Sequence, residues 1–391
     1  MNIVFFAHPA FLEHQSMPRF ARMLADGMAA RGHAVAVWAP EAMFSRVPAP
    51  AALHKWLGYL DQYAAFPVQV RRRLPACPPD TLFVFTDHAL GPWVPLVAGR
   101  PHAVHCHDFL AQRSALGEIP ENPTGWTGRR YQALIRRGYA QARNFISVSR
   151  STAADLRRFL PAPPVRSEMV YNGLNQAFGP QDPVAARTQM ARETGFPLVS
   201  GYLLHVGGNQ WYKNRRGVLE IYDAWRAISA HAWPLLFVGQ VPDAALTAAH
   251  AASPYRADVH FLTQADDALV RRAYAGAQAF LFPSLAEGFG WPIAEAMASG
   301  CPVVTTAEAP MTEVAGTAAF LVPRRPAVAG PAPAWAAEAA RTVEQVAALT
   351  PTARAQAVAA GVANARRFEA ASAIDRIEAI YQDITRHPTA T

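Results

Sequence analysis

Cysteine, lysine and long hydrophobic runs are all scarce in this sequence. The three cysteines, Cys77, Cys106 and Cys301, lie too far apart to form a disulfide framework or a zinc knuckle. No window of 18 apolar residues is free of charges and prolines, which argues against a membrane-spanning helix. The N-terminal segment lacks the basic region and cleavage site of a signal peptide. These absences exclude a secreted mini-protein and an integral membrane protein, and they favour a cytoplasmic globular protein.

Several ligand-binding motifs are missing as well. The chain has no Asp-x-Asp motif for a metal–diphosphate complex, no Gly-x-Gly-x-x-Gly motif and no Walker lysine motif. No pair of acidic residues can be identified as the acid and nucleophile of a glycoside hydrolase. We therefore expect neither a metal ion nor a resident cofactor, and simple hydrolysis is disfavoured.

The residues that are present predict a large α/β protein. Hydrophobic residues make up 51% of the 391 and charged residues 17%, which is enough to form large cores. Short apolar runs alternate with helix-like segments over residues 1–175 and again over 199–370, and a polar, proline-containing linker at 176–198 separates the two series. This pattern predicts two doubly wound, Rossmann-like domains that face an interdomain cleft, where ligands bind at the carboxyl ends of parallel strands.

The last segment of the chain, residues 371–391, has the pattern of an amphipathic helix. Ile374, Ile377, Ile380, Tyr381 and Ile384 fall on one helical face, so this face must pack against another part of the protein. We expect the helix to return to the N-terminal domain.

Positive charge is concentrated in the first half of the chain. Residues 1–190 contain 20 basic and 12 acidic residues, a net charge of +8, whereas residues 191–391 have a net charge of −1. This asymmetry favours an anionic partner, either a phosphorylated or lipid-linked acceptor or a membrane surface touched by Trp56, Leu57 and Arg71–Arg73. Nucleic acid is not an expected partner. A solvated, arginine-rich surface is the alternative explanation.

The densest group of informative residues follows an expected strand at 279–282. A turn with Gly288 and Gly290 leads into a helix opened by a proline, and backbone amides at a helix N-terminus suit a phosphate group. Glu287 lies on this turn and Glu295 lies inside the helix, where carboxylates can accept hydrogen bonds from sugar hydroxyls. Taken alone, two glutamates at this spacing are common surface charges.

The whole string Pro283–Val304, PSLAEGFGWPIAEAMASGCPVV, resembles the retaining glycosyltransferases of family four, which have the GT-B fold. The resemblance is specific over residues 200–323, looser over 100–175, and over 1–99 it rests mainly on the strand–helix pattern. Further matching segments follow in the family's order: Tyr171-Asn172-Gly173, His205-Val206-Gly207-Gly208, Tyr212-Lys213-Asn214 and Glu313-Val314-Ala315-Gly316.

This resemblance implies a binding site for a nucleoside-diphosphate sugar in the second domain. Glu287 would bind hydroxyls of the donor sugar, Glu295 would bind the ribose, and Lys213 would neutralise the phosphates. Lys213 and Lys55 are the two lysines of the chain, so Lys213 is not part of a lysine-rich background, although an ordinary surface lysine is the alternative. The remaining donor-binding positions are Gly207, Gly208, Asn209, Gly288, Phe289 and Gly290.

The resemblance also assigns residues of the first domain to the reaction site. His107 would lie over the donor sugar, with Asp108 orienting its ring or touching the acceptor, and these two with Glu287 form the expected catalytic group. His14 and Ser16 are expected on the acceptor side. His105 should face the packed side of the sheet because side chains alternate along a strand.

The implied activity is transfer of a hexose, with retained anomeric configuration and without a metal, from a nucleoside-diphosphate sugar to an acceptor hydroxyl. Polysaccharide or glycoconjugate synthesis is the expected setting, in the cytoplasm or at the inner face of the membrane. Two departures from the family pattern concern the donor site: Asn209 stands where related proteins often have arginine, and the turn at 8–18 has no glycine. A non-catalytic nucleotide-sugar-binding subunit and an epimerase of the same fold are the alternatives.

Overall fold

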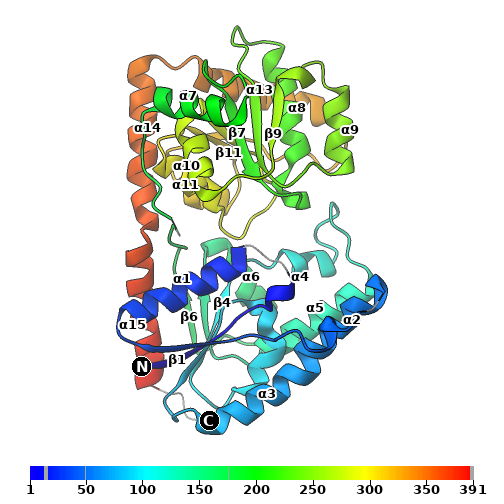
Figure 1. The fold of residues 1–391 in the computed structure, drawn as a ribbon, viewed down its shortest axis with the longest axis vertical. Helices are drawn as coiled ribbons and strands as arrows, with labels where there is room; N and C mark the ends of the chain where they lie inside the picture. The colour runs from blue at the N-terminus through cyan, green and yellow to red at the C-terminus, as the bar shows by residue number, and fades with distance from the viewer. Residues whose placement is uncertain (13–15, 49, 175, 388–391) are drawn as a thin grey trace. The chain divides into compact units, whose positions relative to one another are not determined.

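The structure, a computed structural model, describes residues 1–12, 16–48, 50–174 and 176–387 (Figure 1). It divides into two compact units: unit 1 contains Met1–Ile119, Pro123–Asn175 and Ala370–Thr391, and unit 2 contains Pro120–Asn122 and Gln176–Glu369. Each unit has a six-stranded parallel sheet with helices on its faces. The predicted two-domain α/β fold is confirmed.

The sheet of unit 1 has the strand order β2-β1-β3-β4-β5-β6, so the chain crosses from β2 over β1 before it forms β3. Such crossovers place helices on both faces, so the central strands β1, β3, β4 and β5 are buried, whereas the edge strands β2 and β6 are more exposed. The strands are β1 (Asn2–Phe6), β2 (Ala34–Trp38), β3 (Leu82–Phe85), β4 (His102–Cys106), β5 (Asn144–Ser147) and β6 (Arg166–Met169).

Alternate residues of β1 pack against different helices. Val4 and Phe6 belong to the core formed with α3, η5 and α5, whereas Phe5 packs against Tyr381 of α15. Both faces of the sheet are therefore covered. The helices of unit 1 are α1 (Ser16–Ala30), α2 (Ala51–Leu60), α3 (Phe66–Arg73), α4 (Leu110–Ala115), α5 (Trp126–Tyr139), α6 (Arg150–Phe159), α15 (Ala370–Arg386) and the 3₁₀ helices η1 (Ala10–Leu12), η2 (Phe44–Arg46), η4 (Leu74–Ala76) and η5 (His88–Leu96), with a π-helical turn η3 (Asp61–Ala65) between α2 and α3.

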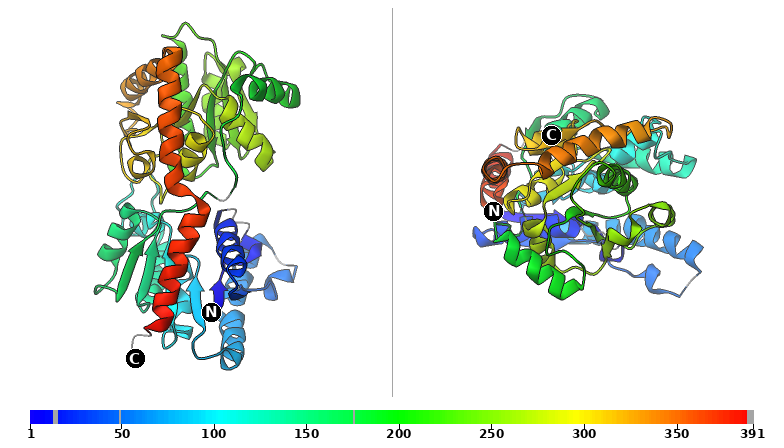
Figure 2. Two further views of the ribbon diagram at one scale, coloured as in Figure 1. Left: turned by 90° about the vertical axis from the view of Figure 1, so that its left-hand side faces the viewer. Right: turned by 90° about the horizontal axis from the view of Figure 1, so that it is seen from above.

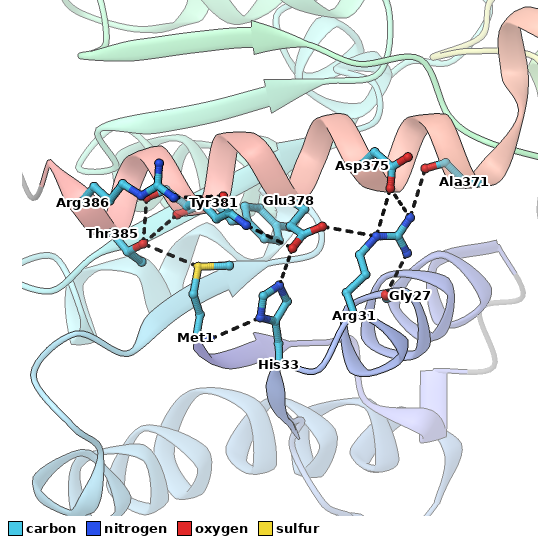
Figure 3. Close-up of polar contacts among 11 residues, drawn as sticks. Met1, Gly27, Arg31, His33, Ala371, Asp375, Glu378, Tyr381, Thr385 and Arg386 are labelled. Carbon is cyan, nitrogen blue, oxygen red and sulfur yellow. Dashed lines mark hydrogen bonds and ion pairs between the residues drawn. The ribbon is translucent and has the colours of Figure 1, made fainter.

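Helix α15, the last element of the chain, packs beside α1 in unit 1 (Figure 2, left). Figure 3 shows the polar contacts: His33 Nε2 donates to Glu378 Oε1 at 2.8 Å, and Arg31 pairs with both Asp375 and Glu378. Beneath them, the Tyr381 hydroxyl lies 2.6 Å from His105 Nε2 inside the core. His105 therefore faces the packed side of the sheet, as predicted.

The sheet of unit 2 has the strand order β12-β11-β10-β7-β8-β9, and all its pairs are parallel. Its strands are β7 (Leu203–Gly207), β8 (Leu235–Gly239), β9 (Val259–Leu262), β10 (Ala279–Phe282), β11 (Val303–Thr306) and β12 (Phe320–Val322). Its helices are α7 (Pro183–Thr194), α8 (Arg215–Arg226), α9 (Ala244–Ala252), α10 (Asp267–Gly276), α11 (Trp291–Ala298), α12 (Met311–Ala315), α13 (Ala332–Ala347), α14 (Pro351–Ala365) and the 3₁₀ helices η6 (Trp211–Lys213), η7 (Arg256–Asp258) and η8 (Arg366–Phe368). Among the described helices, none is both long and apolar enough to cross a membrane.

The range 176–198, predicted as a linker, contains helix α7. Asp182 caps its N-terminus by accepting a hydrogen bond from Val184 N, and Gly195 ends it in a left-handed conformation. Ala186 and Met190 are buried, and α7 packs against α10 of unit 2. Only two buried side chains on a polar helix give a weak periodic signal, which explains why the sequence pattern indicated a linker.

Candidate active site

The predicted phosphate lysine lies at the carboxyl end of β7. Lys213 Nζ donates to Glu287 Oε1 at 2.8 Å, and the Ser284 hydroxyl donates to the same oxygen at 2.9 Å. Both charged side chains are largely buried, with 14% of Lys213 and 8% of Glu287 exposed. The structure thus brings together the cation and the carboxylate that the sequence assigned to opposite ends of a donor molecule.

Two loops that follow neighbouring strands hold this pair. Leu285 N donates to Tyr212 O at 2.8 Å, and Asn214 Nδ2 donates to Pro283 O at 2.8 Å. Asn214 also caps α8 from a left-handed conformation with φ of 51°. Because β7 and β10 are adjacent in the sheet, loops that are 70 residues apart in the sequence meet at one edge.

Two glycines lie where Lys213 passes the end of β7. A Cβ on Gly207 would lie 3.0 Å from His205 Nε2 and 3.6 Å from Lys213 Cδ, so a side chain there would crowd the lysine. A Cβ on Gly208 would lie 2.6 Å from Gln210 Oε1 and 2.7 Å from Gln240 Oε1. Both predicted glycines therefore line the turn that leads to Lys213.

Asn209 forms hydrogen bonds to other residues of unit 2. Its Nδ2 donates to Val241 O at 2.8 Å, its backbone N donates to Gln240 Oε1 at 2.8 Å, and its Oδ1 accepts a hydrogen bond from Arg215. These contacts tie the turn after β7 to the loop after β8. The Asn209 side chain, assigned to donor binding from the sequence, holds this turn in place.

The second predicted glutamate lies one turn inside α11. Gly290, with φ of 101°, forms the N-cap of this helix, and Phe289 is buried against Phe368. Glu295 Oε2 accepts a hydrogen bond from the Tyr274 hydroxyl at 2.9 Å. Burial, together with the Glu295 charge, raises the pKa of Tyr274 well above its usual value, so the hydroxyl remains a donor.

In unit 1, His107 and Asp108 follow β4 as predicted. His107 Nε2 donates to Thr86 O at 2.9 Å, and its ring packs edge-to-face on Phe20. Burial lowers the pKa of His107, so the imidazole is neutral at pH 7. Asp108 Oδ1 accepts a hydrogen bond from Leu110 N. Of the expected acceptor-side residues, His14 lies outside the described residues, and Ser16 is the first residue of α1.

A buried carboxylate beside this histidine was not predicted. Asp87 follows β3, and its Oδ2 lies 2.9 Å from His8 Nε2, while its Oδ1 lies 2.9 Å from His88 Nδ1. Burial opposes ionisation, but the His88 charge and the His8 hydrogen bond outweigh it and hold the Asp87 pKa well below its usual range. The polar dipeptide Asp87-His88 directly after an apolar strand was the signal in the sequence.

Asp87, His8 and His88 show no metal-binding arrangement. No group of three or more His, Cys, Asp or Glu side chains suited to a metal ion occurs in the described part of the chain. His8 follows β1, and Asp87 and His88 follow β3, which lies between β1 and β4 in the sheet. The carboxyl edge of the unit 1 sheet therefore contains a buried polar cluster around Asp87 and His107.

Two family models match successive parts of the chain. Residues 17–178 match the model described as "Glycosyltransferase Family 4", and residues 200–363 match the model described as "Glycosyl transferases group 1". The O-antigen chain mannosyltransferase B of Escherichia coli is 32% identical over 123 residues, which are 31% of this chain and 32% of that protein. The matched segment thus spans about a third of the length of the curated relative.

Solved structures show the same fold over almost the whole chain. Sucrose-phosphate synthase from Thermosynechococcus elongatus has a TM-score of 0.72 at 16% identity, and the match covers 98% of this chain and 99% of the synthase chain. HepE from Anabaena, solved with UDP and glucose, has a TM-score of 0.69 at 17% identity and covers 98% and 100%. WaaG, a glycosyltransferase involved in lipopolysaccharide biosynthesis, has a TM-score of 0.68 at 17% identity and covers 97% and 99%.

The two family models match residues in both units, and the two-sheet architecture is that of the GT-B fold. The chain belongs to the group 1, family four glycosyltransferases.

Proposed function

We propose that this protein transfers a hexose from a nucleoside-diphosphate sugar to an acceptor hydroxyl and retains the anomeric configuration. The observation that supports this most directly is the 2.8 Å contact between Lys213 and Glu287 at the carboxyl edge of unit 2. An ammonium group suits a diphosphate, and a carboxylate held by a neighbouring hydroxyl suits sugar hydroxyls. HepE, which shares the fold, binds UDP and glucose.

The reaction needs a bond to break at the anomeric carbon and a proton to leave the acceptor. In the proposed mechanism, the acceptor oxygen attacks the face from which the diphosphate departs, and the acceptor proton passes to the departing diphosphate oxygen. Lys213 and neighbouring positive groups stabilise the charge that develops on the diphosphate, so the mechanism needs no metal ion. His107, which donates from Nε2 to Thr86, offers Nδ1 as an acceptor for a sugar hydroxyl.

For the acceptor, we propose an anionic or lipid-linked saccharide in polysaccharide or glycoconjugate synthesis. The net charge of +8 in residues 1–190 supports an anionic molecule on the unit 1 side. The similarity to an O-antigen chain mannosyltransferase and the shared fold with WaaG, which acts in lipopolysaccharide biosynthesis, point to the same class of acceptor.

A lipid-linked acceptor brings the protein to a membrane, and we propose that α2 and its flanking segments form the contact at the inner face. The apolar side chains Leu53, Trp56 and Leu60 of α2 are exposed, with 63% of Trp56 accessible. Lys55 of α2 and Arg71–Arg73 at the end of α3 are exposed as well. Aromatic and basic side chains together suit the interface of an anionic bilayer.

Release of a nucleoside diphosphate tests the function. A panel of UDP, GDP and ADP sugars is first screened by thermal shift, because a ligand at 100 times its dissociation constant stabilises a protein by about 2.7 kcal/mol. The protein is then incubated with the stabilising donor and an acceptor extract, and the free diphosphate is measured. We expect Lys213→Ala and Glu287→Gln to lower kcat/KM by at least about 100-fold, because the first removes the charge that stabilises the departing diphosphate and the second removes a charged acceptor for the sugar hydroxyls.

Matched controls are the exposed residues Arg192 and Glu338, whose substitutions Arg192→Ala and Glu338→Gln should leave kcat/KM unchanged. Donor binding without diphosphate release would favour the non-catalytic subunit, and conversion of the donor into its epimer would favour the epimerase. Full activity in Lys213→Ala or Glu287→Gln would show that the site is assigned wrongly.

A further inference from the structure

Arg215, the first residue of α8, carries a buried charge with no nearby counter-ion. Only 6% of it is exposed, its Nη1 donates to Asn209 Oδ1 and to Gln240 O, and its Nε has no hydrogen-bond partner within the described structure. Among the described residues, no carboxylate lies within ion-pair distance of it; Asp243, at the N-terminus of α9, acts on it from farther away. A buried charge without a partner is costly, so an anion is expected to complete this site.

Arg215 and Lys213 lie on the same turn. The Arg215 guanidinium lies 5.3 Å from the centre of the Phe237 ring, which packs 5.6 Å from the His205 ring. A Cβ on Gly207 would lie 3.6 Å from Lys213 Cδ. Burial lowers the pKa of His205 to about 3, and the charges of Arg215 and Lys213 act in the same direction. His205 Nε2, also without a partner in the described structure, lies next to Gly207, where a Cβ would come within 3.0 Å of it. The two cations therefore flank the turn after β7.

The two cations differ in what neutralises them. Lys213 is already paired with Glu287 at 2.8 Å, whereas the Arg215 guanidinium contacts only neutral oxygens and lies 5.3 Å from the centre of the Phe237 ring. Lys213, Glu287 and Arg215 together thus have a net charge of +1, and Arg215 supplies the excess. A diphosphate placed on this turn would meet that uncompensated charge.

We propose that Arg215 provides the second positive charge of the donor diphosphate site, beside the turn after β7, where Asn209 and Gln240 accept its hydrogen bonds. This inference rests on the proposed function, since it assigns a residue to the same donor. It also accounts for Asn209, whose side chain accepts the Arg215 hydrogen bond and carries no charge of its own. The proposed role of Arg215 is thus to bind the phosphates by its charge.

The first experiment compares ligands of one base that differ in phosphate number. Dissociation constants of the nucleoside, its monophosphate and its diphosphate are measured by calorimetry for the full chain and for Arg215→Gln, Arg215→Lys and Asn209→Ala. We expect Arg215→Gln to weaken diphosphate binding at least about tenfold, as loss of a charge-assisted contact does, and nucleoside binding less than about twofold. Arg215→Lys, which keeps the charge, should lose less than about threefold.

Control variants separate charge from packing. Arg216, the next residue, is exposed and pairs with Glu220, so Arg216→Gln should bind every ligand normally. Asn209→Ala breaks the tie to the turn but keeps the arginine, so it should retain most of the diphosphate affinity. Equal losses for the nucleoside and the diphosphate in Arg215→Gln, or an equal loss of diphosphate affinity in Asn209→Ala, would overturn the proposal and leave Arg215 a purely structural role.

A second measurement leaves Arg215 intact and so remains informative if Arg215→Gln does not fold. Inorganic pyrophosphate should raise the melting temperature of the full chain, and it should still do so in Lys213→Ala because Arg215 remains. Loss of pyrophosphate binding in Lys213→Ala would overturn the inference. If pyrophosphate binds but no nucleoside diphosphate is bound or released, the proposed function fails while the anion site at Arg215 stands.

Discussion

At the scale of single residues, Asp87 is a buried carboxylate whose pKa is lowered, so it stays ionised at the carboxyl edge of the unit 1 sheet. Its carboxylate is buried between His8 and His88 and also accepts a hydrogen bond from Ala89 N. Burial alone would lower the pKa of His88, but the Asp87 charge raises it. Each group thus favours the charged form of the other, and the ion pair contributes to folding stability while both groups are ionised.

This coupling predicts a window of pH dependence. Asp87 has a lowered pKa, so its contribution to stability is complete above about pH 4 and is lost as the pH falls further; His88 has a raised pKa, so its contribution is complete below about pH 6.5 and is lost above it. We expect Asp87→Asn to lower the free energy of unfolding by about 3 kcal/mol between these values and by less outside them.

Urea denaturation of Asp87→Asn at pH 3.5, 5.5 and 8.5 measures this window. The exposed Asp80 is the matched control, and Asp80→Asn should have no effect at any of the three values. A loss of stability that does not change with pH would contradict the assigned pair.

At the scale of elements, α2 has exposed apolar side chains, and hydrogen bonds hold the 3₁₀ helix η2 beside it. Asp61, in the π-helical turn after α2, accepts hydrogen bonds from Phe44 N at 2.8 Å and from the Ser45 hydroxyl at 2.6 Å. These bonds hold η2, whose Phe44 is exposed, beside α2. The exposed apolar side chains of α2 and η2 thus form one patch, and such a patch is typical of a site that contacts a partner or a membrane.

Vesicle sedimentation tests this surface. We expect binding to vesicles with about 30% anionic lipid and weaker binding to neutral vesicles, because each basic residue near an anionic surface contributes about 1 kcal/mol. Reversal of Arg71, Arg72 and Arg73 to Glu, or Trp56→Ala, should reduce binding at least about tenfold.

The control for this experiment reverses two exposed arginines of unit 2, Arg192 and Arg256, and should leave sedimentation unchanged. Full binding after reversal of Arg71–Arg73 would show that this surface does not bind lipid.

At the scale of the whole molecule, helix α15 completes the core of unit 1. Residues 370–386 supply the buried side chains Ile374, Ile377, Tyr381 and Ile384, and the methyl groups of Ile374 lie against Gly27 of α1. A Cβ on Gly173 would lie 2.6 Å from Ala370 Cα, so the first residue of α15 also packs closely on unit 1. Unit 1 is therefore assembled from both ends of the sequence.

This arrangement predicts that residues 1–175 do not fold alone. Loss of four large buried side chains removes at least about 6 kcal/mol, which is comparable to the total stability of a domain. Near-ultraviolet circular dichroism should show no fixed tertiary structure for fragment 1–175 and a folded protein when residues 366–391 are fused to it by a flexible linker.

The same fusion with Ile377→Asp is the control and should remain unfolded, because the substitution buries an unpaired charge. Cooperative unfolding of fragment 1–175 by itself would show that α15 is not needed.

The sequence alone determined the features that depend on neighbouring residues. Apolar runs such as 102–106 and 279–282 coincide with β4 and β10, because a strand buried on both faces needs a continuous apolar segment. The apolar run 34–38 also forms a strand, β2, but at the edge of the sheet, where most of its residues are exposed. The string from Pro283 to Val304 forms the predicted turn and helix, and the scarcity of lysine identified Lys213. Helix α7, with only Ala186 and Met190 buried, lacks such a local signal.

The tertiary structure decided which of these residues meet. His8 and Asp87 are 79 positions apart and Tyr274 and Glu295 are 21 apart, yet each pair forms a hydrogen bond because crossover connections bring distant strand and helix ends together. Arg215 is one of many arginines in the sequence, and burial without a counter-ion is what distinguishes it. Burial and pairing depend on the packing of the whole unit, so no local pattern of residues reveals them.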